Sequence, residues 1–503
     1  MDTTPKIIGV VGAGVMGRGI AQLFVQAGHR LRLFDARAGA AAEAKAIVTG
    51  LLERLVAKGV VKAEALAEQI SNIEICAGLA ELAGCDVIVE AIVEELGAKQ
   101  SLFNELEAVV GDETILASNT SSLSVSAIAA SCRKPDRVAG LHFFNPAPLM
   151  KIAEIIPGIR TAPWVVDALR FLIEGAGHKS VTASDQPGFL INHAGRGLYT
   201  EGFRIVEEQV ADFAAVDRIM RDCCGFRMGP FELLDLTGLD VSGKVMQSIF
   251  EQFLQEPRYR PSSLVPARLA AGLFGRKSGE GFYKYDGAQK IEPSEPEPPA
   301  PGKLGPVWVG EGERRAELLQ ILQQAGAEIV AQADAADAVV LMPWGEDITT
   351  AALRLGLDAS AAVGLDPLLH WDKRRVLMTS PVTNAVARDG IHALLAADGT
   401  KVTVIADSPG FVSQRVIAII VNIACEIAQR GIARACEIDP AIRIGLGYPA
   451  GPLELGDKIG ATKILHILET IEQITGDPRY RPSLWLRRRA MLGLSLRQEA
   501  AYA

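Results

Sequence analysis

A glycine-rich turn near the start of the chain constrains its fold more than any other feature. GAGVMG, at residues 12–17, follows the apolar run KIIGVV and opens a stretch with the apolar spacing of a helix. In such a strand–turn–helix unit Gly12 allows the tight bend, Gly14 lets a diphosphate approach the backbone, and Gly17 lets helix and strand pack closely. Asp35 ends the next strand-like segment, 18 residues after Gly17, where a carboxylate can accept hydrogen bonds from both ribose hydroxyls of a dinucleotide. We therefore predict a Rossmann unit that binds NAD, since the acid would repel the 2′-phosphate of NADP.

The alternation of strand and helix continues beyond this turn. Apolar runs of strand length are separated by helix-length segments, which predicts βαβ units and a parallel sheet. The predicted strands lie at residues 6–14, 31–35, 85–92, 114–119 and 137–144. From residue 185 strand signals are absent, and one long helix is expected over residues 187–209. We expect an α/β Rossmann domain over residues 1–184 and an all-α domain over residues 185–290.

A proline-rich segment then divides the chain. Residues 291–302 read IEPSEPEPPAPG, with five prolines and three glutamates. Because proline fixes φ and lacks an amide donor, this composition predicts an extended, semi-rigid linker.

Short motifs of the helical domain return after the linker. DSPGF corresponds to DQPGF, GPLEL to GPFEL, and DPRYRPS to EPRYRPS, at offsets of 222, 222 and 221 residues. Repetition at nearly constant spacing indicates a duplication. We expect a degenerate Rossmann-like α/β domain over residues 303–405 and a duplicated all-α domain over residues 406–503.

Composition excludes several classes of protein. The chain has 51 basic and 60 acidic residues, a net charge of −9, and no basic patch, so we expect no nucleic-acid partner. Seven cysteines without a CxxC spacing suggest neither a disulfide framework nor a metal site. MDTTPK lacks the pattern of a signal peptide, and the longest apolar runs are shorter than a membrane span. We expect a cytoplasmic protein without a membrane partner.

Polar side chains follow two of the predicted strands. SNTSS, at residues 118–122, follows one strand, and HFFNPAP, which begins at His142, ends another. The carboxyl ends of parallel strands line a ligand crevice, so Ser121, His142 and the nearby Glu154 are expected at one edge of the sheet. An imidazole, a carboxylate and hydroxyls together suit removal of a proton from a substrate alcohol by a general base.

Four motifs, taken in their order along the chain, resemble the NAD-dependent L-3-hydroxyacyl-CoA dehydrogenase family. They are SNTSS, HFFNPAPLMKIAEI, DQPGFLIN and GRKSGEGFYKYD. The resemblance covers residues 6–286 closely and the rest less closely. Long bacterial members with a second copy resemble hydroxybutyryl-CoA and hydroxyadipyl-CoA dehydrogenases. The resemblance implies oxidation of an (S)-3-hydroxyacyl-CoA to the 3-ketoacyl-CoA with NAD, in fatty acid β-oxidation or phenylacetate catabolism.

The resemblance also implies roles for individual residues. His142 would be the general base, Glu154 would orient it, Ser121 would bind the 3-oxygen near the nicotinamide, and Asn192 would hold the same region from the second domain. Lys58 would contact the phosphate of CoA. The implied substrate-binding residues are Ser121, Asn192 and Lys58. The implied NAD-binding residues are Gly12, Gly14, Val15, Met16, Gly17, Asp35, Glu94, Lys99, Ser121, Asn145 and Lys277.

The second copy lacks the equivalents of several of these residues. At an offset of 298 the three glycines become Gly310, Gly312 and Arg315, and Asp35 becomes Ala333. Asn192 becomes Gln414, and MTSPVTN at residues 378–384 is the expected counterpart of the HFFNP strand, with no histidine. We therefore expect one NAD site and one catalytic site in each chain.

Several alternatives stay open. In shorter relatives two helical domains pair between chains, so the duplicate predicts a pseudo-dimeric monomer, with a homo-oligomer as the alternative. A non-enzymatic, crystallin-like NADH-binding protein would not need Ser121, His142, Glu154 and Asn192. A dehydrogenase of free β-hydroxy acids would carry a catalytic lysine on the long helix, and residues 188–210 contain none. The acyl group is open, and Arg196 is a candidate for holding an anionic acyl end.

Overall fold

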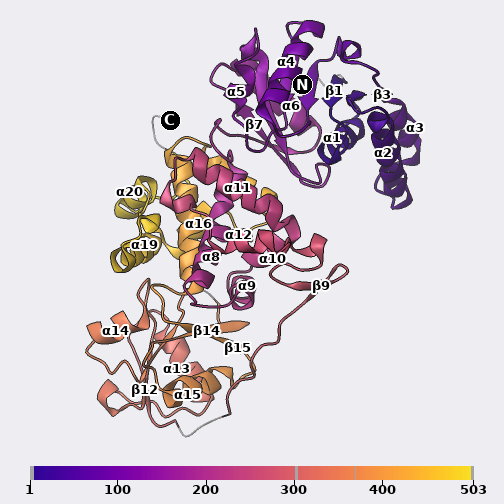
Figure 1. Ribbon diagram of the computed structural model, residues 1–503. Coiled ribbons are helices and arrows are strands. Elements are labelled where there is room, and N and C mark those ends of the chain that lie inside the picture. The colour runs from indigo at the N-terminus through magenta and orange to yellow at the C-terminus, as the bar shows by residue number, and fades with distance from the viewer. Residues whose placement is uncertain (1–4, 301–303, 369, 500–503) are drawn as a thin grey trace. The chain divides into compact units, whose positions relative to one another are not determined.

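The chain forms two compact units in a computed structural model that describes residues 5–300, 304–368 and 370–499 (Figure 1). Unit 1 comprises residues 1–193 and 430–446, and unit 2 comprises residues 194–429 and 447–503. The segment 430–446 therefore belongs to the compact unit of the first α/β part, although it lies within the predicted second helical domain. The five predicted segments stay a prediction, and the end of the predicted linker, residues 301–302, lies outside the described residues.

The centre of unit 1 is an eight-stranded sheet. Its order is β3-β2-β1-β4-β5-β6-β7-β8. The strands are β1 (Ile7–Val11), β2 (Arg30–Phe34), β3 (Ile73–Ile75), β4 (Val87–Glu90), β5 (Ile115–Ser118), β6 (Val138–Phe143), β7 (Ile152–Pro157) and β8 (Lys179–Thr182). All neighbours are parallel except β6 and β7. The predicted parallel sheet needs this correction because residues 144–151, which join β6 to β7, are too few for the crossover that a parallel connection requires.

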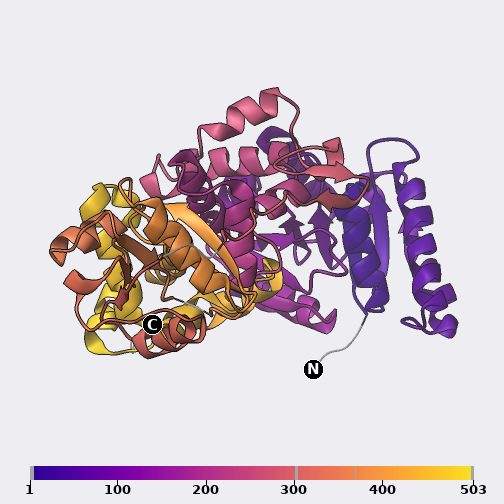
Figure 2. The same ribbon diagram turned by 90° about the horizontal axis from the view of Figure 1, so that it is seen from below.

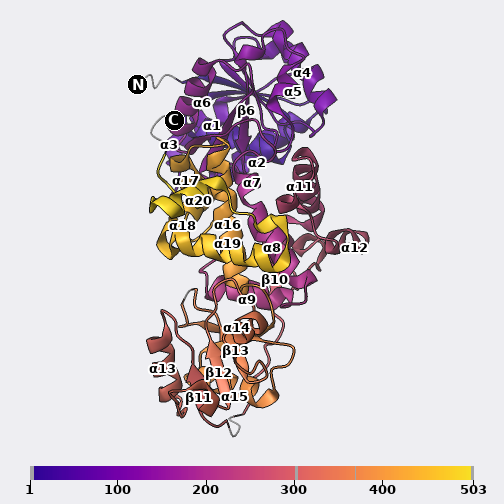
Figure 3. The ribbon, with the colours of Figure 1, turned by 90° about the vertical axis from the view of Figure 1, so that its left-hand side faces the viewer.

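Helices cover both faces of this sheet. They are α1 (Val15–Gln26), α2 (Ala40–Ala57), α3 (Ala63–Ser71), α4 (Leu96–Val109), α5 (Val125–Ala129), α6 (Pro163–Gly175) and α17 (Ala435–Gly445). The one-turn helix α7 (Ile191–Ala194) follows β8 in the chain. One apolar layer includes Phe24 of α1, Leu52 of α2 and Leu169 of α6, and the other includes Phe103 of α4 and Ile128 of α5. Figure 3 shows α1 and α6 on one side of the sheet and α4 and α5 on the other. The two buried layers hold the strand ends, and therefore the site, in a fixed arrangement.

Unit 2 contains both sets of repeated helical motifs and the second sheet (Figure 2). The first set is α8 (Arg196–Glu207), α9 (Phe213–Asp222), α10 (Pro230–Thr237), α11 (Leu239–Gln252) and α12 (Leu264–Ala270). The second set is α16 (Val412–Gln429), α18 (Pro452–Ile459), α19 (Ala461–Thr475) and α20 (Leu484–Leu492). The long helix predicted over residues 187–209 is present as α7 and α8, which are separated by Gly195. Helix α16 is apolar and long enough to cross a membrane, but 89% of it is buried, as in the core helix of a globular domain.

The two PRYRPS motifs contact the opposite helical set reciprocally. Arg258, of the first motif, forms an ion pair with Glu426 of α16. Tyr480, of the second motif, donates a hydrogen bond of 2.7 Å to Glu201 of α8. Each motif thus contacts the long helix of the other set, through glutamates that are not equivalent positions of the repeat. The motifs recur because they join the two helical sets inside unit 2.

The second sheet has five strands in the order β11-β12-β13-β14-β15. They are β11 (Val307–Val309), β12 (Ala338–Leu341), β13 (Ala362–Leu365), β14 (Arg374–Thr379) and β15 (Lys401–Ala406), with helices α13 (Arg315–Gln324), α14 (Ile348–Arg354) and α15 (Ala385–Ala396). Strands β13 and β14 are antiparallel, as β6 and β7 are in unit 1. Strands β14 and β15 are parallel, as β7 and β8 are. The shared pattern agrees with the predicted degenerate Rossmann-like unit.

Before this sheet the chain forms a short hairpin, β9 (Lys284–Asp286) and β10 (Gln289–Ile291), and then the proline-rich segment. Residues 292–300 carry no regular element. Two of their glutamates form ion pairs, Glu292 with Arg218 at 3.3 Å and Glu295 with Arg374 at 2.6 Å. The described part of the predicted linker is thus anchored to α9 and β14 and is more than a spacer.

Candidate active site

The glycine turn has the geometry that its sequence predicts. Gly12 adopts a φ of 101°, in the left-handed region that favours glycine. A Cβ on Gly17 would lie 1.7 Å from the carbonyl oxygen of Gly12, so helix α1 can pack here only without a side chain. A Cβ on Gly14, at the N-cap of α1, would meet no protein atom within 4 Å. The open space beside the amino end of α1 fits the diphosphate of a dinucleotide.

Asp35 lies directly after β2 and faces this turn. Its carboxylate accepts hydrogen bonds from the amides of Ala13, at 2.7 Å, and Arg37, at 2.8 Å. Arg37, the cation that could favour NADP, forms an ion pair with Glu43 at 2.7 Å. The residues present therefore fit NAD: a carboxylate is held beside the turn, and the neighbouring guanidinium is already paired.

His142 and Glu154 meet across the antiparallel pair of strands. They are register partners on β6 and β7, and His142 Nδ1 lies 2.6 Å from Glu154 Oε2. The imidazole is 4% exposed and the carboxylate is fully buried. A carboxylate on Nδ1 fixes the tautomer in which Nδ1 carries the proton, which leaves Nε2 free to accept one. The pair has the geometry of an oriented general base.

The same carboxylate holds the start of α7. Glu154 Oε1 accepts hydrogen bonds from the amides of Leu190, at 2.9 Å, and Ile191, at 2.8 Å. These are amides at the amino end of a helix, where a negative charge is favourable. Asn192 is the next residue and is half-buried. Glu154 therefore fixes both the imidazole and the turn that carries Asn192. Asn192, expected from the second domain, belongs to unit 1.

Ser121 lies in a turn organised by Glu94. Glu94 Oε1 accepts hydrogen bonds from the amides of Ser121, at 2.8 Å, and Ser122, at 3.0 Å, and from the Thr120 hydroxyl at 2.7 Å. Burial alone would raise the pKa of Glu94, but the charge of Lys99 and these hydrogen bonds outweigh it and lower the pKa. The carboxylate therefore keeps the charge with which it holds the turn.

A single side chain joins the Ser121 turn to the His142 strand. Asn119 Oδ1 accepts a hydrogen bond of 2.8 Å from the amide of Phe143. Strands β5 and β6 are parallel neighbours, so Ser121 and His142 both lie toward the carboxyl edge of the sheet. The structure thus brings Ser121, His142, Glu154 and Asn192 into one unit, on elements linked by hydrogen bonds.

Other predicted contacts have different surroundings. Lys99 is buried in an ion pair with Glu90, whereas Asn145, after β6, is exposed. Lys58 is exposed directly after α2. Lys277 belongs to unit 2, where it forms an ion pair of 2.6 Å with Asp240.

The second copy corrects one predicted correspondence. Gly364 and Leu365 of β13 have the antiparallel register that Gly140 and Leu141 have in β6, so Asp366 takes the place of His142. The segment 378–384, expected to match the HFFNP strand, instead begins at the end of β14, the counterpart of β7. Sequence offsets alone missed this because the connections between the strands differ in length.

Asp366 is held as a structural residue. Gln414 Nε2 donates to its carboxylate at 3.1 Å, and the Ser413 hydroxyl donates to the other oxygen. Burial raises the pKa of Asp366. Arg315, in the place of the third glycine, donates a hydrogen bond of 3.1 Å to the carbonyl of Val309. The described residues of the second copy place neither an imidazole nor a third glycine at these positions.

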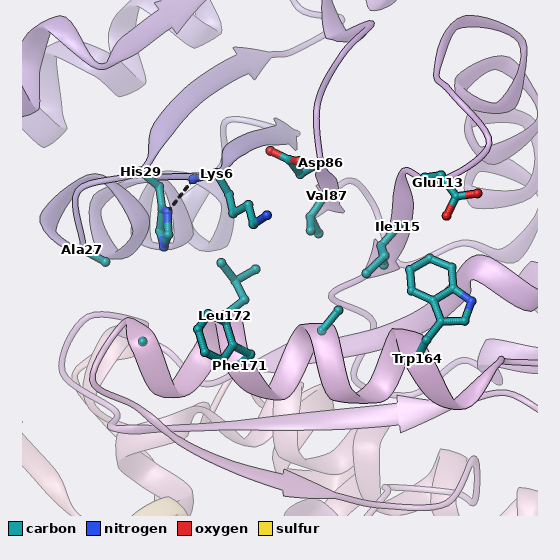
Figure 4. A pocket seen from close by; sticks show the side chains of 12 residues that line it. Lys6, Ala27, His29, Asp86, Val87, Glu113, Ile115, Trp164, Phe171 and Leu172 are labelled. Carbon is teal, nitrogen blue, oxygen red and sulfur yellow. Dashed lines mark hydrogen bonds between the residues drawn. The ribbon is translucent and has the colours of Figure 1, made fainter. Parts of the chain in front are cut away.

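A cavity of about 340 Å³ in unit 1 lies away from these residues (Figure 4). It is lined by the first residues of β4 and β5, Val87 and Ile115, and by α6. In Figure 4, Trp164 and Phe171 rise from α6 along its lower side. The cavity lies at the amino ends of the strands, the edge opposite the glycine turn, and it takes no part in the site.

Sequence reasoning missed three residues that support the site: Glu90, Asn119 and Asp185. Asp185 accepts hydrogen bonds from the amides of Val125 and Ser126 at the start of α5. Asp407, at the same place in the second DxPGF motif, accepts from the amide of Ile348 at the start of α14. The repeated DxPGF motif could have identified Asp185, because an acid that is retained in both copies is expected to have the same role in both.

Comparisons with known proteins agree with this geometry. The family model described as 3-hydroxyacyl-CoA dehydrogenase, NAD binding domain, matches residues 7–186. The model described as 3-hydroxyacyl-CoA dehydrogenase, C-terminal domain, matches residues 188–285 and again residues 410–501. The chain is 36% identical to a 3-hydroxyadipyl-CoA dehydrogenase of Escherichia coli, over 97% of this chain and 98% of the relative.

A shorter relative and a relative of known structure are also 3-hydroxyacyl-CoA dehydrogenases. A 3-hydroxybutyryl-CoA dehydrogenase of Bradyrhizobium diazoefficiens is 37% identical over 58% of this chain and 99% of its own length. A crystal structure of a 3-hydroxybutyryl-CoA dehydrogenase from Escherichia coli K12 matches with a TM-score of 0.86 and 34% identity, over 97% of this chain and 99% of that chain. The similarity therefore extends over both units and includes the second copy.

Proposed function

Because the chain belongs to the 3-hydroxyacyl-CoA dehydrogenase family, it is an NAD-dependent oxidoreductase of 3-hydroxyacyl-CoA, and we propose that His142 is its general base. The observation that carries the proposal is the buried His142–Glu154 pair, which leaves Nε2 as the acceptor at the carboxyl edge of the sheet. A positioned base of this kind typically contributes about 10²- to 10⁴-fold to a rate.

The chain's own residues have distinct tasks in this reaction. His142 Nε2 removes the proton of the substrate's 3-hydroxyl, and Glu154 stabilises the imidazolium that forms. Ser121 and Asn192 hold the 3-oxygen, each on a backbone segment fixed by a glutamate. NAD supplies the acceptor for the hydride that leaves the same carbon. The glycine turn, with Val15 and Met16, and Asp35 hold the cofactor, and Glu94, Lys99 and Asn145 complete its surroundings in unit 1.

The acyl group is proposed from the relatives. A relative that matches 97% of this chain is named for 3-hydroxyadipyl-CoA, and a solved relative with the same coverage is named for 3-hydroxybutyryl-CoA. We assign these two thioesters as candidate substrates, with Lys58 at the phosphate of CoA. We further propose that the enzyme acts in fatty acid β-oxidation or phenylacetate catabolism, in the cytoplasm and without nucleic-acid or membrane partners.

The second helical set takes the place of a second chain. Relatives of about half this length carry one set, whereas here two sets join through reciprocal contacts of the PRYRPS motifs. We therefore propose a pseudo-dimeric monomer, with a homo-oligomer as the alternative. Two rival functions explain less. In a crystallin-like NADH-binding protein the buried His142–Glu154 pair would have no function. A dehydrogenase of free β-hydroxy acids would need a catalytic lysine on the long helix, and residues 188–210 contain none.

The test of the proposed function is NADH formation with purified protein, NAD and (S)-3-hydroxybutyryl-, hydroxyhexanoyl- and hydroxyadipyl-CoA. H142Q should lose at least about 100-fold in kcat, as expected for loss of a general base. The matched control is H466Q, an exposed histidine of α19, which should keep full activity. The thioester with the highest kcat/KM identifies the substrate. Wild-type protein that binds NADH but oxidises none of the thioesters would instead support the crystallin-like role.

A further inference from the structure

Three charged side chains, the buried Glu90 and Lys99 and the partly exposed Glu94, form a cluster next to the Ser121 turn, and Glu90 has no assigned role. We propose that Glu90 is a positioning residue: through Lys99 and Glu94 it fixes the Ser121 turn and sets the net charge beside the nicotinamide of NAD. The inference rests on the proposed function in one respect, the placement of Ser121 near the nicotinamide.

Glu90 is the last residue of β4 and is fully buried. Its Oε1 accepts hydrogen bonds from Lys99 Nζ, at 2.6 Å, and from the amide of Ile92, at 2.7 Å. Its Oε2 accepts from the hydroxyl of Ser118, at 2.6 Å. Removing a carboxylate from water is costly, and three donors offset that cost. A buried glutamate therefore joins the ends of β4 and β5, directly before the turn that carries Ser121.

Lys99 connects this glutamate to the turn. Its ammonium is 1% exposed and lies 2.6 Å from Glu90 and 3.3 Å from Glu94. Glu94 presents Oε2 to Lys99 and Oε1 to the donors of the Ser121 turn. The path from Glu90 to Ser121 consists of direct contacts between groups that are mostly buried. Loss of Glu90 would leave Lys99 with one carboxylate and would free it to move toward Glu94, which changes how the turn is held.

The cluster also carries a net charge. Glu90 and Glu94 contribute −2 and Lys99 contributes +1, so the sum is −1. The nicotinamide ring is cationic in NAD⁺ and neutral in NADH. A negative cluster beside it favours binding of the oxidised cofactor, the form with which a hydroxyacyl substrate must react. Burial makes the effect larger than that of surface charges, which solvent and salt screen.

Four proteins test this proposal by direct binding of NAD⁺ and NADH without substrate. Wild type and the E90Q/K99M double variant both carry −1, E90Q carries 0, and K99M carries −2. We expect E90Q to lower the affinity for NAD⁺ relative to NADH by on the order of ten-fold, as loss of one nearby charge implies. The double variant should restore the wild-type ratio of the two affinities. It should still lose kcat, since Glu94 no longer has the ammonium of Lys99 to fix its position and the Ser121 turn is held less firmly.

A matched control is E107Q. Glu107, also buried and on α4, pairs with Arg137 at 3.5 Å and accepts from the amides of Arg133 and Lys134. This variant should leave the affinity ratio unchanged. Equal ratios in E90Q and wild type, with both proteins folded by circular dichroism, would overturn the charge role. A double variant with wild-type kcat would overturn the positioning role. The affinity ratio is measured without an acyl substrate, so it tests the charge role even if the proposed substrate is wrong. In that case the wild type itself would be inactive on the thioesters, which distinguishes the two failures.

Discussion

At the scale of single residues, the site depends on buried carboxylates whose partners are fixed by the backbone. Glu154 has one oxygen on His142 and the other on two amides of the α7 turn. Breaking a buried ion pair by removing one partner costs more than the pair contributes, because the remaining charge is left unpaired. Such groups are therefore sensitive positions for substitution.

The substitution E154Q tests this at the base. The amide retains the shape of the side chain but cannot stabilise the imidazolium, so we expect kcat to fall by roughly 10²- to 10³-fold. The measurement is kcat at saturating NAD and thioester. E105Q, at an exposed glutamate of α4, is the control. A variant with the wild-type kcat would show that Glu154 does not assist the base.

Asp35 permits a second test at this scale. D35S removes the acceptor for the ribose hydroxyls, and we expect KM for NAD to rise by roughly ten-fold or more, the loss of one or two hydrogen bonds to a charged group. The kcat at saturating NAD should change little, because Asp35 does not contact the reacting atoms. Kinetics with NAD and NADP check this, and an unchanged preference for NAD would contradict the assigned role.

At the scale of elements, the glycine turn must satisfy two requirements, close packing of helix α1 and access for the ligand, and different glycines satisfy them. Gly17 is needed for packing within the protein, because a Cβ would collide with the carbonyl of Gly12. Gly14 is needed for the ligand, because its surroundings hold no protein atom within 4 Å. The two positions therefore give different results when each is replaced by alanine.

We expect G14A to fold with wild-type stability and to lose most of its NAD affinity. G17A should lose both, since the turn must open to admit the methyl group. G50A, inside α2 with no neighbour within 4 Å, is the control and should be as stable as wild type or slightly more so. Thermal unfolding and NADH binding separate the cases, and a stable G17A would contradict the packing argument.

The loop after β6 depends on a buried histidine. His178 is 3% exposed, and its Nε2 lies 2.8 Å from the carbonyl of Ala147, two residues after Asn145. Burial lowers the pKa of His178 below its ordinary value of 6.5. A base with a lowered pKa is neutral in the folded protein while the unfolded chain takes up a proton. Its contribution to stability is therefore complete above pH 6.5 and is lost as the pH falls below it.

The variant H178Q keeps a donor for Ala147 and removes the titration. We expect the melting temperature of wild type to exceed that of H178Q at pH 7.5 and the difference to shrink as the pH falls to 5. Differential scanning calorimetry at several pH values measures it. A difference that is constant with pH would show that His178 does not titrate in this range.

At the scale of the whole molecule, duplication is the dominant feature. Helices α8 and α16 pack closely, with Gly197 against Ile420 and Ile423. A chain with one helical set would expose this apolar surface to water, and exposed apolar faces of this kind drive association. The second set covers the first inside unit 2.

We expect the full chain to be a monomer of 53.6 kDa and a truncation that ends near residue 290 to self-associate or precipitate. Light scattering coupled to size-exclusion chromatography gives the masses. A truncated chain that stays monomeric, soluble and fully active would refute the idea that the duplicate replaces a partner chain.

The amino-acid sequence alone determined the features that depend on local pattern. These include the glycine turn with Asp35, the strand and helix alternation, the repeated motifs and, through resemblance, His142 and Ser121. Each is encoded within a few consecutive residues, where backbone geometry and spacing of apolar residues dictate the structure.

Only the tertiary structure decided the register and the packing that bring distant side chains together. The resemblance implied that Glu154 orients His142, and the antiparallel β6–β7 register places the two side chains 2.6 Å apart. The same register in the second copy identifies Asp366 as the counterpart that the offsets missed. The Glu90–Lys99–Glu94 cluster likewise exists only because β4, α4 and the Ser121 turn pack together. Such contacts are set by strand order and packing, which no local pattern records, because they depend on the lengths of the connections and on all the buried neighbours at once.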